Sequence, residues 1–249
     1  MNKIKELYNV YYCMWCGKPL EALPIDGKCP ICHQDRFRFI ERYVESDPHN
    51  VQLIKISSAN VINNMRAGNL WFQSPHCFNE YQGDGEKVRK DIHDSRYSSI
   101  DENAYVEDKN VDTYRLLCFY ALKVDTDGNF LETPNNELKE FGAFYSIVDI
   151  ETLLVRLKTY LSSLNEEVNY IANWVNYLGD SYSGAYSPFS KFPKDSYQNE
   201  FRIVLISNTF LSYGKDPYKT SQLMADLSEV FSEPQPLDNL LFGKNLNDL

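Results

Sequence analysis

Four cysteines near the start of the chain stand at a spacing that suits a metal ion. Cys13, Cys16, Cys29 and Cys32 form two Cys-x-x-Cys pairs with twelve residues between them. In a reducing compartment such pairs indicate a metal site before disulfides, and four thiolates complete the tetrahedral coordination of zinc. The spacing therefore predicts a structural Zn²⁺ in a zinc ribbon, since a catalytic zinc usually keeps one coordination position open.

A second group of chemically useful side chains lies in the sequence YQNEFRIVL. Residues two apart share one face of an extended strand, so Gln198, Glu200 and Arg202 are expected to project together. Phe201 and Ile203 then occupy the other face. A carboxylate at the start of a strand, beside a loop, is well placed for a cleft. The alternative interpretation is a structural salt bridge between Glu200 and Arg202 at a strand end.

The elements that must position these groups follow from local patterns. Apolar alternation predicts a strand over residues 51–56. Ser57 or Ser58 can cap a short helix that ends at Arg66, with Gly68 just beyond it. The residues LWF that follow indicate another strand.

The later elements are predicted from longer apolar runs. A buried strand is expected over residues 114–124, and a strand that leads into a helix is expected within 137–161. One face of that helix is expected to be apolar, because it carries Ile150, Leu153, Leu154, Leu157 and Leu161. Residues 168–172 alternate as a strand, although a helix remains possible. A further strand is expected from Asn199 to Ile206. Strands with interspersed short helices, without regular alternation, indicate an α+β fold.

Length and composition favour one large domain with a small appendage. The chain has 249 residues, a net charge of −10 and 43% hydrophobic residues. We expect a zinc ribbon over residues 1–45 and an α+β domain over 46–249, with a mixed, mostly antiparallel sheet and flanking helices. No apolar run reaches bilayer length and no secretory leader is recognised, so we expect a cytoplasmic protein that does not engage membranes. The acidic balance argues against broad electrostatic binding of nucleic acid.

The domain resembles a family of uncharacterised bacterial and phage-borne proteins over roughly residues 51 to 206. Members of that family open with a Lys-Tyr strand, continue with a "lwfs-p-FND" segment, carry "CFS" in a middle strand and end in a "K...Y..E-EyRi" strand. The matching residues in this chain are Lys55, Leu70, Trp71, Phe72, Ser74, Pro75, Phe78, Asn79, Glu80, Cys118, Phe119, Lys191, Tyr197, Glu200, Phe201 and Arg202.

The arrangement is also similar to the ADP-ribosyltransferase fold, a split sheet in which a late Gln-x-Glu or Glu-x-Glu faces NAD. That resemblance implies that Glu200 binds the nicotinamide ribose and stabilises the oxocarbenium-like transition state, while Gln198 orients the acceptor. It further implies NAD contacts from a set of residues on several elements. These are Lys55, Ser74, Asn79, Tyr120 and Arg202, with Tyr120 standing where the family shows Ser.

Two functions of different classes follow as expectations. The first is an NAD-dependent ADP-ribosyltransferase-like protein of a toxin, phage-defence or counter-defence system, whose zinc ribbon recognises the target. The second is a non-catalytic zinc-ribbon adaptor or inhibitor that binds a protein partner, or nucleic acid through the ribbon. The 18 tyrosines and the acidic charge motivate the second function, since tyrosine is common at interfaces.

Overall fold

The computed structural model describes residues 11–12, 19–20, 28, 50–79, 96–99, 104–107, 111–177, 184–185, 188–191, 193–214, 216–220 and 226–246. Near the N-terminus, the two-residue strands β1 (Tyr11–Tyr12) and β2 (Pro19–Leu20) pair antiparallel. The four cysteines predicted to bind zinc lie outside the described residues, so the zinc ribbon stays a prediction. Among the helices that the structure describes, none combines the length and the apolar character needed to cross a membrane.

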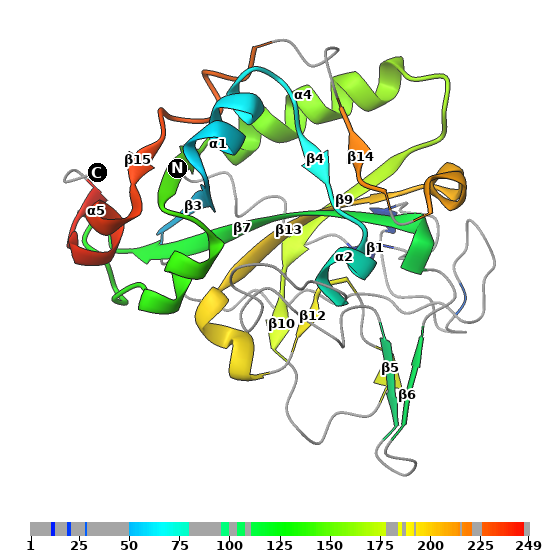
Figure 1. Cartoon of the computed structure of the whole chain (residues 1–249), viewed down its shortest axis with the longest axis horizontal. Coiled ribbons are helices and arrows are strands. Elements are labelled where there is room, and N and C mark those ends of the chain that lie inside the picture. The colour runs from blue at the N-terminus through cyan, green and yellow to red at the C-terminus, as the bar shows by residue number, and fades with distance from the viewer. Residues whose placement is uncertain are drawn as a thin grey trace.

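A six-stranded sheet organises the domain, and every strand pair in it is antiparallel. The strand order is β15-β8-β3-β7-β13-β9, and Figure 1 shows the long strand β7 running through its middle. The bounds are β3 (Asn50–Ser57), β7 (Tyr114–Val124), β8 (Phe144–Val148), β9 (Asn169–Trp174), β13 (Glu200–Ile206) and β15 (Gln235–Pro236). The predicted α+β class with a mostly antiparallel sheet is thereby confirmed.

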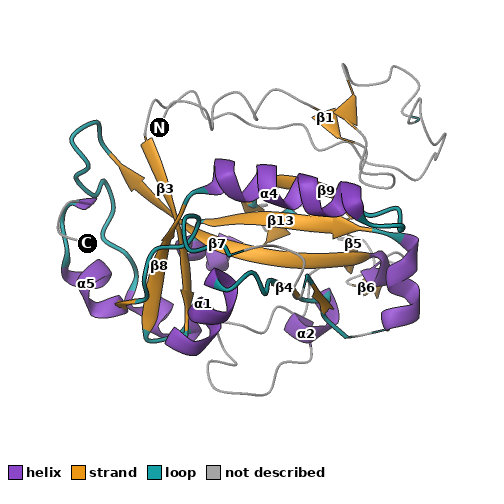
Figure 2. Ribbon diagram, turned by 90° about the horizontal axis from the view of Figure 1, so that it is seen from above, coloured by secondary structure: helices purple, strands orange, loops and turns teal. Residues whose placement is uncertain are grey.

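One face of the sheet is covered by α4 (Ile150–Ser163), which lies along β13 (Figures 1 and 2). Asp149 caps its first turn, because its side chain accepts a hydrogen bond from the Thr152 backbone N–H at 3.1 Å. The apolar face of the helix was predicted from its spacing, and it packs against alternate residues of β7 and β13. This core includes Leu117, Phe119, Leu153, Leu154, Leu157, Leu161, Phe201, Ile203 and Leu205.

A second core fills the other face at the end of the sheet that carries β3 and β8. It joins alternate residues of these strands to the 3₁₀ helix η3 (Asn136–Phe141) and to α5 (Leu237–Phe242). Its buried members are Ile54, Ile56, Tyr120, Leu122, Val124, Leu138, Tyr145, Leu237, Leu240 and Leu241. The middle strands β7 and β13 therefore carry buried side chains on both faces.

The sheet divides between β3 and β7. Their pairing stops at Ile54 opposite Tyr120, yet β3 continues to pair with β8 as far as Ser57, and β7 continues with β13. Figure 2 shows β3 and β8 crossing steeply over the direction of β7 and β13. Beyond Ile54, therefore, the backbone groups on the facing edges of β3 and β7 no longer bind each other, and the strands diverge.

A short helical segment follows β3. Helix α1 (Ala59–Arg66) begins after Ser58, whose side chain accepts from the Val61 backbone N–H at 3.3 Å. It ends at Arg66 before Gly68, which has a positive φ of 90°. Both helix boundaries were predicted from the sequence.

The chain then passes along the opening between the diverging strands. Strand β4 (Trp71–Phe72) and helix α2 (Pro75–Asn79) lie here, and Gln73 forms a bridge to Leu116 of β7. The remaining elements are β5 (Arg96–Ser99), β6 (Ala104–Glu107), η2 (Val111–Thr113), β10 (Asn176–Tyr177), β11 (Gly184–Ala185), β12 (Ser190–Lys191), η4 (Pro193–Gln198), η5 (Asn208–Tyr213) and β14 (Tyr218–Lys219).

Candidate functional site

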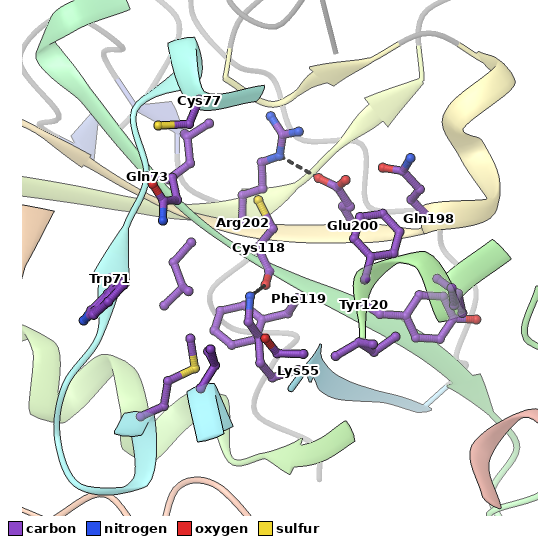
Figure 3. Close-up of a pocket in the computed structure, with 18 of the residues that line it drawn as sticks. Lys55, Trp71, Gln73, Cys77, Cys118, Phe119, Tyr120, Gln198, Glu200 and Arg202 are labelled. Atoms are coloured by element: carbon purple, nitrogen blue, oxygen red, sulfur yellow. Dashed lines mark hydrogen bonds and ion pairs between the residues drawn. The ribbon is translucent and has the colours of Figure 1, made fainter. Parts of the chain in front are cut away.

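A cavity of about 460 Å³ opens where β3 and β7 diverge (Figure 3). Its volume lies within the roughly 300–1,000 Å³ typical of small-molecule sites. The polar and charged groups of its wall come from β3, the segment from α1 to α2, β7, β12, η4 and β13. They are Lys55, Ser57, Asn64, Asn69, Gln73, Cys77, Cys118, Tyr120, Lys191, Gln198, Glu200 and Arg202.

Lys55 spans the gap between the two diverging strands. It follows Ile54, the last residue of β3 that pairs with β7, and its Nζ donates to the Cys118 carbonyl of β7 at 2.9 Å. Its ammonium also lies 5.8 Å from the centroid of the Phe119 ring. The lysine thus replaces the missing backbone pairing and brings a positive charge to the cavity wall.

A tight turn brings Gln198 and Glu200 to the same wall. Gln198 ends the 3₁₀ helix η4, and β13 begins at Glu200, so the predicted strand starts one residue later than expected. Asn199 between them has a φ of +37°, a conformation that asparagine tolerates better than most residues. Its backbone carbonyl accepts from Ala121 N at 2.9 Å, and its side-chain amide donates to the Ala121 carbonyl. These contacts fix the turn against β7.

Glu200 lies between two cations at the end of the cavity. Its Oε1 is 2.8 Å from Lys191 Nζ, and its Oε2 is 2.7 Å from Arg202 Nε. The side chains of all three are at least nine-tenths buried. The ion pair with Arg202 that was predicted as an alternative is therefore present.

Three further contacts orient this group. Lys191 Nζ also donates to Gln198 Oε1 at 2.5 Å, and Arg202 Nη1 donates to the Pro188 carbonyl at 2.6 Å. The backbone N–H of Glu200 donates to the Tyr177 hydroxyl at 3.0 Å. Gln198 and Glu200 are consequently held side by side by one lysine, with their polar ends toward the cavity (Figure 3).

Electrostatics keep the carboxylate ionised. Burial by itself raises the pKa of Glu200, but Arg202 and Lys191 outweigh that effect and lower the pKa to about 2. Burial raises the pKa of Cys118 to about 11 and that of Tyr120 to about 12. At neutral pH the cavity therefore presents a carboxylate beside a protonated thiol and a protonated phenol, which favours electrostatic stabilisation over attack by a cysteine thiolate.

The charge of the wall differs in sign from that of the protein. Among the described lining residues, the cations Lys55, Lys191 and Arg202 outnumber the single carboxylate of Glu200, whereas the whole chain carries −10. Such a local excess of positive charge favours a ligand with anionic groups. Aromatic rings of Trp71, Phe119, Tyr120 and Phe141 line the same space and offer flat surfaces for an unsaturated ring.

Five of the seven residues predicted for catalysis or NAD binding meet at this cavity. Gln198, Glu200, Lys55, Tyr120 and Arg202 all line it. Tyr120 reaches it because it stands opposite Glu200 in the ladder between β7 and β13.

Of the other two predicted residues, Ser74 lies outside the lining, and the side chain of Asn79 is not described. Ser74 is fully buried outside the lining, where its Oγ accepts from the His76 backbone N–H at 3.4 Å at the start of α2. Its hydroxyl serves the helix terminus, because the first N–H groups of a helix lack partners within the helix. Asn79 is the last residue of α2, and its side chain lies outside the described part of the structure.

Several residues of the site were not assigned from the sequence. The resemblance includes the lining residues Lys191, Cys118 and Trp71 without giving them a role. Tyr177 is not among the lining residues, but its hydroxyl accepts from the Glu200 backbone N–H, and no sequence pattern indicates this contact. Lys191 lies in a two-residue strand whose parallel pairing with β10 brings it beside Glu200. The resemblance includes a lysine nine residues before Glu200, but this spacing does not predict that the lysine side chain contacts the carboxylate.

Comparison of the chain with protein-family models, with curated proteins and with solved structures gives no match in any of the three.

Proposed function

We propose that the cavity binds NAD and that the protein is an ADP-ribosyltransferase-like enzyme. The observation that carries the proposal is the position of Glu200, an ionised carboxylate beside Gln198 on the wall of a cavity of ligand size. The divergence of β3 from β7 also supports it, because the resemblance implies a split sheet around the ligand.

The lining fits the chemistry of NAD. Its pyrophosphate is anionic, and the cations Lys55, Lys191 and Arg202 line the cavity. Its nicotinamide and adenine rings are flat, and four aromatic side chains are available to them. The positively charged nicotinamide ring is best placed toward Glu200, the one carboxylate among the described lining residues.

The reaction breaks one bond and forms another. The glycosidic bond from C1′ of the ribose to the nicotinamide nitrogen breaks, and its electron pair stays on nicotinamide, which leaves neutral. Positive charge then develops on the ribose, where the Glu200 carboxylate stabilises the transition state more than the ground state. An acceptor nucleophile, or water, bonds to C1′ and releases its proton to solvent. Gln198, two residues before Glu200, is placed to orient that acceptor.

Glu200 has to exchange a partner, or share an oxygen with one, when substrate binds. Its two oxygens contact Lys191 and Arg202, so a ribose hydroxyl must displace one of these contacts or share an oxygen with it. A carboxylate oxygen can accept more than one hydrogen bond, which makes sharing possible. Arg202 is 1% exposed and also donates to the Pro188 backbone carbonyl, whereas Lys191 is 6% exposed and its second contact is with the side chain of Gln198. Lys191 is therefore the cation whose contact is more readily exchanged.

The proposal includes a target beyond the cavity. In it, the N-terminal zinc ribbon recognises the acceptor, a protein or a nucleic acid, and the α+β domain carries out the transfer. Such an activity is suited to a toxin, a phage-defence factor or a counter-defence factor, because modification of one host or phage component changes its function. The non-catalytic adaptor is the other candidate function.

The experiment uses the full chain and NAD labelled on its adenylate phosphate. Purified protein is incubated with bacterial lysate or with nucleic acid, and both the labelled acceptor and the free nicotinamide are quantified. We expect the wild type to give transfer, Glu200→Gln to lose transfer and nicotinamide release together, and Gln198→Leu to lose transfer more than NAD hydrolysis. The absence of transfer and of NAD cleavage in the wild type would sink the enzymatic proposal. A stoichiometric partner that Glu200→Gln still captures would then support the adaptor.

A further inference from the structure

Trp71 marks a second end of the cavity, away from the carboxylate. Figure 3 places its indole at the opposite side of the view from Gln198 and Glu200, with Lys55 between them. The residue is 44% exposed although it lines the cavity. A large aromatic side chain that is both exposed and part of a cavity wall lies at the mouth, where it can contact a ligand that extends outward.

The strand holds the ring in this position. Trp71 and Phe72 are adjacent in β4, and Phe72 is fully buried in the core, so alternation turns the Trp71 side chain the other way. Trp71 stands opposite Lys219 of β14 in the ladder, and Lys219 Nζ lies 4.7 Å from the indole centroid. A cation against one side of the indole fixes its orientation through a cation–π contact.

Amide side chains accompany the indole. Asn64, Asn69 and Gln73 lie on the same stretch of chain and also line the cavity. The backbone carbonyl of Asn64 accepts from Asn69 N at 3.0 Å, which closes the turn between α1 and β4. A primary amide carries both donors and acceptors, so these three groups can form hydrogen bonds with the donors and acceptors along the edge of a purine. The mouth therefore combines a stacking surface with polar groups of both kinds.

We propose that Trp71 is the platform on which the adenine ring of the substrate stacks. The inference rests on the proposed function for the identity of the ligand, and it assigns the two ends of the dinucleotide. Adenine lies at Trp71, nicotinamide lies toward Glu200, and the pyrophosphate between them lies toward Lys55. Base stacking on an aromatic side chain tolerates many rings, so the amides near Trp71 supply the preference for adenine.

The test compares ligands that share one end of the dinucleotide. Isothermal titration calorimetry measures the Kd of NAD, ADP-ribose and nicotinamide mononucleotide for the wild type, Trp71→Ala and Trp71→Phe. Stacking of one base contributes about 1–3 kcal/mol, so we expect Trp71→Ala to raise the Kd of NAD and of ADP-ribose by about 5- to 150-fold. The Kd of nicotinamide mononucleotide, which lacks adenine, should change less than about twofold. Trp71→Phe keeps an aromatic face and should recover most of the affinity.

Phe242 provides the matched control. It is 71% exposed and has Lys139 Nζ 5.6 Å from its ring, which repeats the geometry of Trp71 and Lys219 outside the cavity lining. Phe242→Ala should leave all three affinities unchanged, and circular dichroism should show that each variant is folded.

The outcomes separate this inference from the proposed function. If Trp71→Ala weakens ADP-ribose selectively while no NAD cleavage occurs, the adenine platform stands and the enzymatic proposal fails. The platform is overturned and the enzyme stands if the wild type cleaves NAD but Trp71→Ala binds ADP-ribose with the wild-type Kd. The same holds if Trp71→Ala raises the Kd of nicotinamide mononucleotide as much as that of ADP-ribose. If the wild type binds neither NAD nor ADP-ribose, both are overturned.

Discussion

The ammonium of Lys191 lies 2.8 Å from Oε1 of Glu200, and both side chains are at least nine-tenths buried. The same ammonium donates to Gln198, so one cation links the two residues that we place at the reacting end of the cavity. A buried carboxylate and a buried ammonium each lose hydration, and their mutual attraction offsets part of that cost. The contact is therefore both a structural element and a control on the charge of Glu200.

Lys191→Met should destabilise the protein by about 3–5 kcal/mol, because it leaves a buried carboxylate with one cation fewer. Urea unfolding followed by circular dichroism measures the change. The matched control is Lys123→Met, which removes a lysine from an ion pair of similar length, 2.9 Å to Glu132, at a far more exposed site. That control should cost about 0–1 kcal/mol. Equal losses in the two variants would show that the Lys191 contact is no stronger than a surface pair.

The pH dependence of stability should carry a contribution from Glu200. Its folded pKa is lowered to about 2, whereas an unfolded Glu titrates near about 4.3, so the unfolded chain binds this proton first as the pH falls. The stabilisation is therefore fully present above about pH 5 and is lost as the pH approaches 2. We expect the difference in unfolding free energy between the wild type and Glu200→Gln to shrink from about pH 7 to about pH 3.5. A difference that stays constant would contradict the lowered pKa.

Gly142 should tolerate no side chain, because it lies against the end of β3 beside the cavity. Its φ is +153°, and a Cβ there would stand 2.3 Å from the backbone carbon of Ser57. Gly142→Ala should therefore cost more than the roughly 1–3 kcal/mol of unfavourable dihedrals alone. Gly214→Ala is the control, since its φ is +54° and its Cβ would meet nothing within 4 Å. Thermal unfolding of the two variants separates the steric clash from the dihedral effect. Equal shifts in Tm would contradict a clash at Gly142.

Removal of the buried Arg115 should lower the stability of the protein strongly. It is fully buried, and its guanidinium donates to the backbone carbonyls of Asp112, Tyr114, Phe210, Gly214 and Asp216. Arg115→Met strands these acceptors, each at about 1–3 kcal/mol when it stays buried, so unfolding should occur at markedly lower urea concentration. Arg156→Met, which breaks an exposed pair with Glu229, should change stability by less than about 1 kcal/mol. Similar midpoints for the two variants would contradict this role of Arg115.

Elements with a continuous or strongly periodic apolar pattern could be predicted from the sequence. Strand β7 has the bounds Tyr114–Val124 that its apolar run indicates, and α4 buries the leucines that its spacing selects. The region around residues 168–172, which the pattern left open between strand and helix, forms strand β9 (Asn169–Trp174). This segment forms a strand because it pairs with β13 at the edge of the sheet, and the local sequence pattern does not show which strand it pairs with.

The site could be predicted only in part. Glu200 and Arg202 share a face because β13 is extended, but Gln198 reaches the same cavity through a 3₁₀ helix and the positive φ of Asn199. Lys191 reaches Glu200 through the pairing of two very short strands, and Lys55 lies at the point where β3 leaves β7. These contacts depend on strand register and divergence, which arise from the whole fold and leave no local pattern.

The most direct measurement of the central claim is the rate of nicotinamide release from NAD by the purified chain and by Glu200→Gln. Removal of one electrostatic stabiliser of a transition state typically lowers kcat by about 10²–10³-fold. We predict such a loss for Glu200→Gln, with the Kd of NAD changed by only a few-fold because glutamine preserves the shape of the side chain. A wild type that releases no nicotinamide, or a Glu200→Gln variant that keeps the wild-type kcat, would contradict the assignment of Glu200 as the catalytic carboxylate.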